Sequence, residues 1–478
     1  MDACARSTET PGNSLFSRDA PTLERWIQKG SEKNVRKRNR PQSRESVEEP
    51  DFGPTSLLSG RNMLLSITLL SLVFGSPAPL FEWTASRSGD RFGSSLACVG
   101  DVNGDGVVDW AAGAPRAQVA GQAVGRVQVM SGADGSVLHQ WLGGPGASGL
   151  GADVAGVGDL DGDGHGDILV GAPQAAAGKG EARLYSGATG MLLRTWVGAV
   201  AGDQFGRALC GLGDVDGDGV GDLGVGAPAS HSAGTHAGEV SVYSGRLGTL
   251  LFQVQGAAWD HLGHDLVGLG DVNGDGCGDL AIGIPFSDDA AFNGGRVQVH
   301  SGRDGGFLWG ASGHTAGDQF GFALGSGADV DMDGIQDLVV VAPAADASGF
   351  DSGSASVLSG VDGHVLFVIP GPGAGVYMSA AQLLQDQDGD GRAEVLTGTP
   401  AAPKGSEHAG YVGVHSGVDG SLLRRLRGAR DFGWFGFSLA AGGDLDGDGV
   451  HDFAVGAPGH DDHPEIFGSV QLLSALPF

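Results

Sequence analysis

Residues 159–167 read Asp-Leu-Asp-Gly-Asp-Gly-His-Gly-Asp, with oxygen-bearing side chains at positions 1, 3, 5 and 9 and Gly at position 6. The same pattern begins six more times, at Asp101, Asp214, Asp271, Asp329, Asp386 and Asp444. Successive copies lie 55 to 58 residues apart. A fixed period of this length is typical of repeat architectures. The nonapeptide therefore marks one structural unit that is present seven times.

Each unit contains the same further parts in the same order. A short apolar stretch that opens with Phe-Gly or Leu-Gly precedes the nonapeptide, as at Phe205-Gly206. An apolar stretch ending in Gly-Ala-Pro follows, as at residues 226–228, then an alternating segment, a Ser-Gly-x-x-Gly turn and a last apolar stretch. Short segments bounded by Gly, Pro and Asp are typical of β-strands. We expect repeats near 89–146, 147–201, 202–258, 259–316, 317–373, 374–430 and 431–478.

Four strands joined by tight turns form a meander, and a single such sheet cannot bury both of its faces. Seven sheets can bury one another by radial stacking, as propeller blades do. A solenoid of sheets is the alternative, and it would need polar caps at both ends. We therefore predict an all-β fold, a seven-bladed β-propeller of four-stranded antiparallel blades.

The two ends of the repeat region favour a closed ring. The seventh unit stops after its third strand, at residues 468–473, while residues 80–83 form an extra segment that aligns with the fourth strand. One missing strand and one spare strand complete one blade. We expect residues 80–84 to pair with residues 469–473, which would leave no open sheet edge at the seam.

The acidic nonapeptides are the candidate metal sites. Four carboxylates within nine residues repel one another unless a cation joins them, and Ca²⁺ takes six to eight oxygen ligands. A loop that offers positions 1, 3, 5 and 9 together with the backbone carbonyl of position 7 can wrap one ion. The predicted ligands are Asp101, Asn103, Asp105, Val107, Asp109; Asp159, Asp161, Asp163, His165, Asp167; Asp214, Asp216, Asp218, Val220, Asp222; Asp271, Asn273, Asp275, Cys277, Asp279; Asp329, Asp331, Asp333, Ile335, Asp337; Asp386, Asp388, Asp390, Arg392, Glu394; and Asp444, Asp446, Asp448, Val450, Asp452.

Other interpretations of these loops are less suitable. An EF-hand needs a Glu at position 12 and flanking helices, whereas position 12 of the first copy is Ala112 in a strand pattern. Mg²⁺ tolerates flexible all-protein cages poorly. Asp/Gly turns held by their own side chains remain the alternative without an ion. We expect up to seven Ca²⁺ ions, because the loops hold 26 of the 48 carboxylates that follow residue 62.

Composition and charge exclude two classes of protein. The chain of 478 residues contains 89 Gly, which is unfavourable inside helices, so a helical protein is not expected. The formal net charge is −29, and Lys179 and Lys404 are the only lysines after residue 62. Nucleic-acid binding needs a basic surface that neutralises phosphates, so we expect no nucleic-acid partner. The four Cys residues are far apart, and we expect free thiols, most of them buried.

The N-terminal region has a different composition. Residues 1–62 are polar, Arg-rich and without periodicity, which indicates a disordered leader. Met63 precedes an apolar run at residues 64–74 and small residues at 75–78, the pattern of a secretory signal peptide. We expect translation to start near Met63, the signal to span 63–78 and the propeller to span 79–478. A cytoplasmic tail followed by an uncleaved anchor is the alternative.

The composite of Phe-Gly, the acidic nonapeptide and Gly-Ala-Pro resembles the FG-GAP repeat of the integrin α-subunit head and its bacterial secreted relatives. The resemblance covers roughly residues 80–478. It implies a seven-bladed propeller with calcium in hairpins on one face and ligand or partner contacts on the other. Integrin α heads place calcium in only the later blades, whereas all seven loops qualify here. Other departures are Met378-Ser379 in the sixth unit and Val341-Ala342-Pro343 in the fifth. The chain adds no leg domain or membrane anchor after the propeller, so we do not expect an integrin heterodimer.

In a four-strand meander, the acidic loops and the Ser-Gly turns share one face. The loops after Gly-Ala-Pro and before Phe-Gly share the opposite face and vary among the copies, and binding residues favour such loops on rigid scaffolds. We expect a protein or glycan ligand there, without catalysis, on a secreted or cell-surface monomer with no membrane anchor after signal cleavage. A calcium-dependent polysaccharide lyase and a structural surface protein remain alternatives. The residues expected to be exposed on this face are Phe286, Asp288, Asp289, Phe292, Phe350, Trp434, His460, Asp461, Asp462 and His463.

Overall fold

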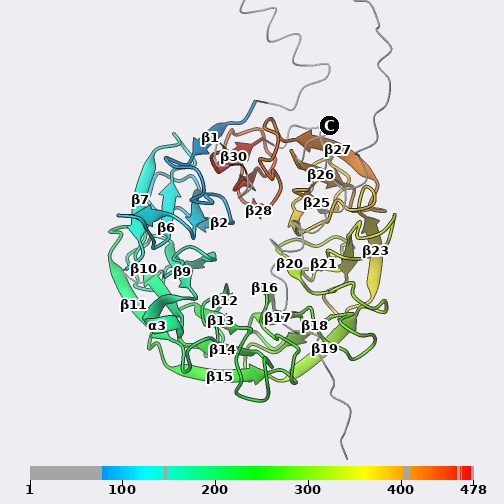
Figure 1. Ribbon diagram of the computed structural model, residues 1–478, viewed down its shortest axis with the longest axis horizontal. Helices are drawn as coiled ribbons and strands as arrows, with labels where there is room; N and C mark the ends of the chain where they lie inside the picture. The colour runs from blue at the N-terminus through cyan, green and yellow to red at the C-terminus, as the bar shows by residue number, and fades with distance from the viewer. Residues whose placement is uncertain (1–77, 145–147, 402–408, 460–462, 464–465, 475–478) are drawn as a thin grey trace, which may run out of the picture. The chain divides into compact units, whose positions relative to one another are not determined.

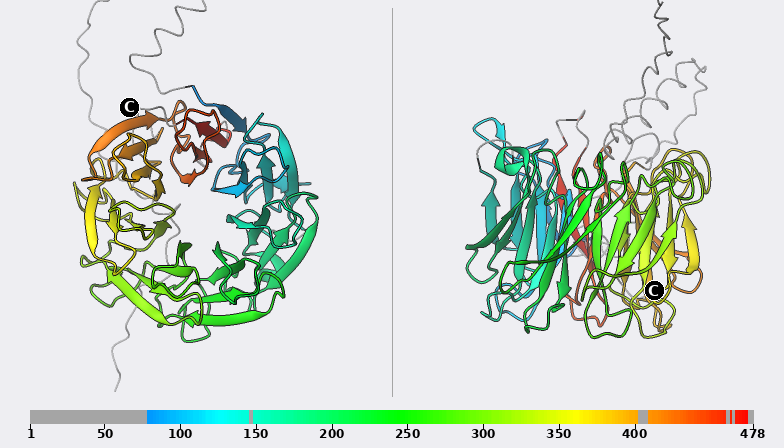
Figure 2. Two further views of the ribbon diagram at one scale, coloured as in Figure 1. Left: turned by 180° about the vertical axis from the view of Figure 1, so that it is seen from behind. Right: turned by 90° about the horizontal axis from the view of Figure 1, so that it is seen from below.

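Seven four-stranded antiparallel sheets stand around a central axis in the computed structural model (Figures 1 and 2). The structure describes residues 78–144, 148–401, 409–459, 463 and 466–474. The predicted leader and nearly all of the predicted signal segment lie outside these residues. The first strands of neighbouring blades pack against one another around the whole ring, and β28 of the last blade packs against β2 of the first. The predicted seven-bladed β-propeller is confirmed.

In blades 1 to 6 the strands follow chain order from the strand nearest the axis to the strand on the rim, and in blade 7 the rim strand is β1. The strands are, blade by blade, β2 (Ser95–Gly100), β3 (Asp109–Ala114), β6 (Arg126–Met130), β7 (Val137–Leu142); β8 (Val154–Gly158), β9 (Asp167–Ala172), β10 (Glu181–Tyr185), β11 (Leu192–Val197); β12 (Ala208–Gly213), β13 (Asp222–Ala227), β14 (Glu239–Tyr243), β15 (Leu250–Gln255); β16 (Leu266–Gly270), β17 (Asp279–Ile284), β18 (Arg296–His300), β19 (Phe307–Ser312); β20 (Ala323–Gly325), β21 (Leu338–Ala342), β22 (Ser354–Leu358), β23 (Val365–Pro370); β24 (Ala380–Leu384), β25 (Glu394–Thr399), β26 (Tyr411–His415), β27 (Leu422–Arg427); and β28 (Ser438–Ala441), β29 (Phe453–Ala457), β30 (Ser469–Leu473) with β1 (Phe81–Thr84).

The seventh blade contains strands from both ends of the propeller. β1 is its outer strand and pairs antiparallel with β30, with Phe81 opposite Leu472 and Thr84 opposite Ser469. This is the pairing that the sequence predicts for residues 80–84 and 469–473. Trp83 on β1 also donates its indole N–H to the carbonyl oxygen of Gly135 in the first blade, at 2.8 Å. The seam is therefore held both within the seventh blade and between the seventh and first blades.

Close backbone contacts between blades explain why Phe-Gly and Gly-Ala-Pro recur together. A Cβ atom on Gly113, from the Gly-Ala-Pro of blade 1, would lie 2.1 Å from the carbonyl oxygen of Gly151, from the Leu-Gly of blade 2. At the seam, a Cβ on Gly456 would lie 2.2 Å from the carbonyl oxygen of Gly93. No side chain fits at such distances, so glycine is required where the second strand of one blade approaches the next blade.

The two places where these motifs lack their Gly fall at the same blade interface. Blade 5 has Val341 in place of the Gly of Gly-Ala-Pro, and blade 6 has Ser379 in place of the Gly of Phe-Gly. Val341 packs in one buried cluster with Met378, which replaces the Phe of blade 6. The backbone N–H of Ser379 still donates to the carbonyl oxygen of Gly398 at 3.0 Å. The interface between blades 5 and 6 therefore uses apolar side chains where the others use close backbone packing.

Tryptophans on the rim connect successive blades. Trp141, Trp196 and Trp309 donate their indole N–H groups to carbonyl oxygens in the Ser-Gly-x-x-Gly turn of the following blade, at 2.9 to 3.0 Å. Trp196 and Trp309 also lie in buried apolar clusters. These strand aromatics therefore belong to the packing between blades.

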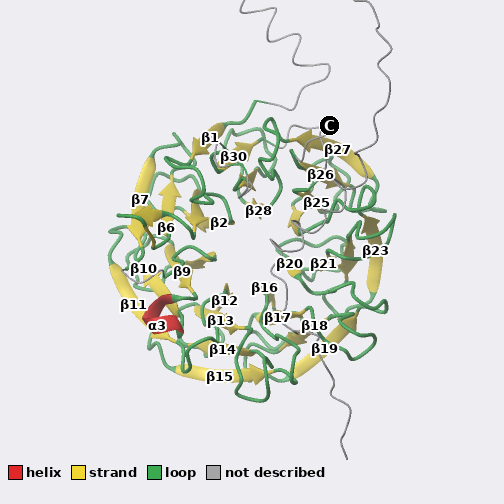
Figure 3. Cartoon of the chain, viewed as in Figure 1, coloured by secondary structure: helices red, strands yellow, loops and turns green. Residues whose placement is uncertain are grey.

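Two small elements were not predicted. A short hairpin of β4 (Gln118–Val119) and β5 (Gln122–Ala123) forms in the loop after Gly-Ala-Pro of blade 1, and a four-residue helix, α3 (Ala175–Gly178), forms in the same loop of blade 2 (Figure 3). Both lie at the end of the propeller opposite the acidic loops. They are local variations of the loops that differ from one repeat to the next.

Candidate metal centres

Each acidic nonapeptide forms the loop between the first and second strands of its blade, and in blades 1 to 6 a Ser-Gly turn joins the third and fourth strands at the same end. The position-9 carboxylate connects the two turns. Its Oδ1 accepts the N–H of the Ser-Gly glycine in five blades, at 2.9 to 3.1 Å, as from Gly132 to Asp109. The prediction that the acidic loops and the Ser-Gly turns share one face is confirmed.

The position-1 carboxylate organises the tip of each loop. In the first loop, Oδ1 of Asp101 accepts the backbone N–H of Gly104 at 2.7 Å and of Asp105 at 3.1 Å, and Oδ2 accepts that of Gly106 at 2.8 Å. Burial acts to raise the pKa of Asp101, but the three hydrogen bonds outweigh it and hold the pKa below its usual value. The Gly104 and Gly106 bonds have equivalents in the other six loops, although Met332 takes the first Gly position in the fifth.

The position-9 carboxylate lies at the base of the loop and is completely buried in all seven blades. Its second oxygen accepts the backbone N–H of the position-2 residue, as from Val102 to Asp109 at 2.8 Å. Burial raises the pKa of this group in the first six blades, to about 6 in Asp167 and Asp337. A buried carboxylate among other carboxylates favours the protonated form unless a cation binds nearby.

Five of the seven loops bring acidic side chains together closely enough to hold a metal ion. In each, one carboxylate oxygen per residue lies within 4.8 Å of the others. The groups are Asp159, Asp161, Asp167; Asp214, Asp216, Asp218; Asp329, Asp331, Asp333; Asp386, Asp388, Asp390, Glu394; and Asp444, Asp446, Asp452. Of the loops described, the first and fourth form no such acidic group, and these two carry Asn at position 3.

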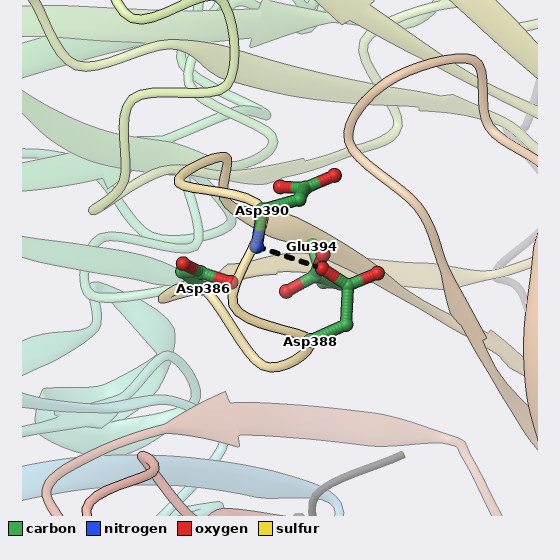
Figure 4. Close-up of side chains that lie close together, drawn as sticks. All are labelled: Asp386, Asp388, Asp390 and Glu394. Carbon is green, nitrogen blue, oxygen red and sulfur yellow. Dashed lines mark hydrogen bonds between the residues drawn. The ribbon is translucent and has the colours of Figure 1, made fainter.

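The sixth loop gathers four carboxylates and carries the longer side chain at position 9 (Figure 4). Oε2 of Glu394 accepts the N–H of Gln387 at 2.5 Å, whereas its Oε1 accepts no hydrogen bond from any described residue although the side chain is fully buried. Burial, and the charges of Asp388, Asp386 and Asp390, raise the pKa of Glu394 to about 8. A divalent cation among these four carboxylates would supply the missing partner of Oε1.

In the first and fourth loops, the Asn side chain at position 3 forms hydrogen bonds with neighbouring carboxylates. In the first loop, Oδ1 of Asn103 accepts the N–H of Asp105 at 2.9 Å, and its Nδ2 donates to Oδ2 of Asp105 at 2.9 Å. Asn273 donates in the same way to Asp275 at 3.1 Å and to Asp279 at 3.4 Å. The Asn amide thus supplies a donor to the position-5 carboxylate in these two loops, where the other five loops have a carboxylate at position 3.

The position-7 residues were predicted as carbonyl ligands, and the structure shows what their other groups do. In all seven loops the position-7 N–H donates to Oδ1 of the position-5 Asp, as from Val107 to Asp105 at 2.8 Å. Two position-7 side chains form hydrogen bonds to the preceding blade: the Cys277 thiol donates to the carbonyl of Val215, and Arg392 donates to the carbonyl of Val330 at 2.8 Å. Cys98, Cys210 and Cys277 are free thiols, as expected.

Sequence reasoning did not assign the Ser-Gly turn to these centres. The hydroxyl groups of Ser186 and Ser301 donate to Oδ2 of Asp163 and Asp275, at 3.4 and 3.1 Å, respectively. The guanidinium of Arg246 lies 3.5 Å from Oδ2 of Asp218. The sequence placed the Ser-Gly turns on the face of the acidic loops, and the Ser that opens this turn in six of the seven units was the signal that could have indicated these contacts.

Two predictions about the opposite face are wrong. Phe286 and Trp434 were expected to be exposed, but both are buried. The Phe286 ring lies against His261, with ring centroids 5.1 Å apart, and Trp434 stacks on Phe437 at 5.7 Å. Phe286 also contacts the His264 ring, and the Arg91 guanidinium lies 5.6 Å from the centre of the Trp434 ring; a loop's composition does not reveal such contacts.

The other candidates on the opposite face have mixed outcomes. Phe292 and Phe350 are exposed by 60% and 61%, and Asp288 and Asp289 are also exposed. His463 is partly buried and stacks on Phe432 with ring centroids 3.6 Å apart. His460, Asp461 and Asp462 lie outside the described residues.

Comparisons with known proteins agree with this geometry. A family model described as the FG-GAP repeat matches residues 150–185, 205–243, 266–300 and 435–473. Integrin alpha-8 of Mus musculus is 30% identical over 211 residues, which are 40% of this chain and 19% of that protein. Integrin alpha-V of Gallus gallus is 31% identical over 209 residues, 40% of this chain and 20% of that protein. The aligned part of this chain thus spans about a fifth of the length of these relatives.

A chain in the solved mitotic checkpoint complex aligns with 91% of this chain at 12% identity and a TM-score of 0.48, which is too low to support an argument. No helix among the described residues is long and apolar enough to cross a membrane. The chain is therefore a seven-bladed β-propeller that carries FG-GAP repeats and is similar in sequence to integrin alpha chains over about 40% of its length.

Proposed function

We propose that this chain is a non-enzymatic ligand-binding or adhesion module that acts outside the cell, secreted or at the cell surface, and holds Ca²⁺ in its acidic loops. The similarity to integrin alpha chains supports the adhesion class. The apolar run after Met63 supports export, with residues 63–78 as the signal peptide. We propose that the mature protein is a monomer.

The single observation that carries the calcium proposal is the sixth loop. Four carboxylates converge there, and a fully buried Glu394 oxygen has no hydrogen-bond donor among the described residues. The donors are all oxygen atoms on a short loop, which is the ligand set and flexibility that Ca²⁺ prefers over Mg²⁺ and transition metals. The other six loops repeat the same nonapeptide, so we propose up to seven sites.

The ligand is proposed to bind the face opposite the acidic loops. Its loops differ among blades that are otherwise alike, and Phe292 and Phe350 expose most of their side chains there. Exposed aromatic rings on loops held by a rigid scaffold are suited to bind a protein or a glycan. Calcium on the other face would act at a distance, by holding the blades that present these loops.

Two measurements test the proposal. Elemental analysis of the dialysed mature protein should return several equivalents of calcium, and essentially none would refute the calcium sites. Arrays of extracellular proteins and glycans should yield a ligand whose binding falls on replacing Phe292 and Phe350 with Ser. Phe307→Ser, which removes an equally exposed ring from the rim strand β19, is the matched control. Release of unsaturated sugars from acidic polysaccharides would instead indicate a lyase.

A further inference from the structure

The residue at the third position of the rim strand contacts the following blade almost all the way around the ring. His139, Arg194 and Trp309 form hydrogen bonds with carbonyl oxygens in the Ser-Gly turn of that blade. Arg194, for example, donates to those of Gly245 and Arg246 at 3.0 and 3.1 Å. In three other places a phenylalanine ring packs on the last Gly of the turn, where a Cβ atom would lie 2.6 to 2.9 Å from the ring: Phe81 on Gly135, Phe252 on Gly305 and Phe367 on Gly420.

Arg424 holds this position on β27 of blade 6 and is the exception. Leu426, two residues along the strand and therefore on the same face, is buried in a cluster with Phe453 of blade 7, so Arg424 also faces that blade. The third strand of blade 7 is followed by Ser474-Ala475, and its fourth strand, β1, comes from the other end of the propeller. No Ser-Gly turn among the described residues is therefore placed to meet Arg424.

The guanidinium of Arg424 is half-buried without a partner. It forms no hydrogen bond or ion pair with any residue that the structure describes. Burial lowers the pKa of Arg424, and no acidic group opposes that shift. A cation that loses part of its hydration is costly unless an anion or a hydrogen-bond acceptor replaces the water. The site therefore favours an anion from outside the chain.

Arg424 belongs to a basic strip that consists of Arg424, Arg425, Arg427 and Arg430. These seven positions hold four of the 17 basic residues that follow residue 62. The strip follows β27 on the outer rim, next to the seventh blade (Figure 1). Arg425, Arg427 and Arg430 are exposed, and the Arg425 guanidinium lies 4.7 Å from the centre of the Tyr411 ring. The strand rises about 3.4 Å per residue, so the charges are spread along a line rather than gathered at one point.

Charge balance within the chain does not account for the strip. Several arginines elsewhere pair with carboxylates of the propeller: Arg126 with Asp90, Arg183 with Glu181, Arg246 with Asp218 and Arg296 with Asp289. In the strip, Arg430 lies 3.8 Å from Glu82, and both side chains are largely exposed. Arg424 and Arg425 have no carboxylate within 4 Å among the described residues, although the chain is strongly acidic.

The shape of the strip selects among anions. Guanidinium groups pair with sulfate, phosphate and carboxylate oxygens, and a line of them fits an extended polyanion better than a compact one. An acidic peptide would gain most by adding a strand to β27, but charged side chains on an edge strand oppose such pairing. A sulfated polysaccharide carries its charges along a chain that needs no main-chain pairing.

We propose that the basic strip binds a sulfated polysaccharide. Sulfate groups would pair with Arg425 and Arg427 on the exposed side of β27, and Arg424 would supply donors at the seam with blade 7. This surface is separate from the face that carries Phe292 and Phe350, so the inference goes beyond the proposed function. The net charge of −29 is screened over about 8 Å at physiological salt, and the local strip therefore governs binding.

The first test measures binding of a fluorescent heparin decasaccharide to the full protein. The double variant Arg425→Gln/Arg427→Gln should bind about tenfold more weakly, with a salt dependence reduced by roughly one counterion for each arginine. Arg194→Gln is the matched control, because it removes an arginine from the equivalent rim position of blade 2, and it should bind as the wild type does. No binding by the wild type, or an equal loss in the control, would overturn the inference. Equally tight binding of deca-glutamate or of a DNA decamer would refute the preference for a sulfated sugar.

The second test separates binding from stability. Arg194→Gln should lower the Tm by roughly 2 °C, because it removes hydrogen bonds to the turn of blade 3. Arg424→Gln should leave the Tm unchanged and weaken decasaccharide binding. An equal drop in Tm for Arg424→Gln, with binding unchanged, would show that Arg424 is structural and refute its role in the strip.

A third comparison distinguishes this inference from the proposed function. Replacing Phe292 and Phe350 with Ser should not change decasaccharide binding. Loss of binding in that variant, with full binding in Arg425→Gln/Arg427→Gln, would place the polysaccharide on the opposite face and refute the basic strip. Binding that depends only on the arginines supports the strip, whatever ligand the opposite face takes.

Discussion

The carboxylates at the two ends of this propeller behave in opposite ways. At one end, every acidic loop repeats the same contacts: position 1 accepts N–H groups from the loop tip, and position 9 accepts that of position 2. At the other end, one repeat position has a different partner in different blades. Asp90 pairs with Arg126, Oδ2 of Asp260 accepts the N–H of Ala257, and Oδ1 of Asp203 has no hydrogen-bond donor among the described residues.

The difference follows from where the partners lie. The acidic loops find most of their partners within the nonapeptide itself, so each copy of the sequence rebuilds the same site. The opposite carboxylates depend on residues from other loops and strands, which vary among the copies. One end is therefore suited to a common structural task such as ion binding, and the other end can diversify for recognition.

The largest expected effect is on the acidic-loop end. Chelation with EGTA should lower the Tm by about 10 °C or more, because several ions that bind only the folded protein each add stability by mass action. Calorimetry with and without excess Ca²⁺ measures the difference, and Mg²⁺ at equal concentration is the control. An unchanged Tm would mean that the acidic loops do not stabilise the protein by binding calcium, and the proposed difference between the two ends would be wrong.

Glu394→Gln should change the stability of the protein in opposite directions with and without calcium. In Ca²⁺ the variant loses a ligand oxygen and should be destabilised by about 2 kcal/mol, with one fewer equivalent of bound calcium. In chelator the new amide can donate to Asp388 or Asp386, as the Asn103 amide does to Asp105, so the variant should be at least as stable as the wild type. Denaturant unfolding under both conditions measures this, and destabilisation in both would argue for a packing defect without an ion.

Asp153 tests the carboxylates at the opposite end. It lies at the start of the inner strand of blade 2, where Oδ1 accepts the N–H of Val154 at 2.9 Å and Oδ2 that of Leu209 at 2.8 Å. Burial, and then the charge of Asp265, raise the pKa of Asp153 to about 7. The folded protein therefore keeps this proton above the pH at which the unfolded chain releases it, and the group costs stability as the pH rises from about 4 to about 7.

Replacing Asp153 with Asn removes this cost. Relative to wild type, the variant should gain roughly 2 to 3 kcal/mol between pH 5 and pH 8. Urea unfolding of both proteins at pH 5 and pH 8 measures this change in relative stability. Saturating Ca²⁺ keeps the metal sites filled at both pH values. A relative loss of stability at pH 8 would show that the carboxylate is favoured in its charged form.

The smallest expected effect is for Asn103→Asp in the first loop. The change removes the amide donor to Asp105 and restores the carboxylate that five other loops have. The variant should lose about 0.5 kcal/mol in chelator and gain a similar amount in Ca²⁺. Calorimetry during a calcium titration measures the stability difference between the variant and the wild type. The same difference in chelator and in Ca²⁺ would mean that the Asn and Asp loops do not differ in ion binding.

The sequence was sufficient for the blades and the acidic loops because their signals are local. Alternating apolar residues, Gly at position 6 and the Pro of Gly-Ala-Pro specify strand, turn and strand end within one repeat. The predicted exposure was wrong at Phe286 and Trp434, whose rings pack against residues that lie outside their own short motif, such as His261 and Arg91. It also gave no role to Ser186 or Ser301, which reach the acidic loops across the sheet.

The sequence by itself determined the repeat, its sevenfold count and the chemistry of the acidic loops, because each depends on residues within about 60 positions of one another. Only the tertiary structure decided that Gly113 must meet Gly151, that Glu394 leaves one oxygen without a donor, and that Asp203 faces Glu239 across an open cavity. These features depend on the close approach of separate strands and loops. Side-chain length and register fix such distances, and neither can be evaluated before the chain is folded.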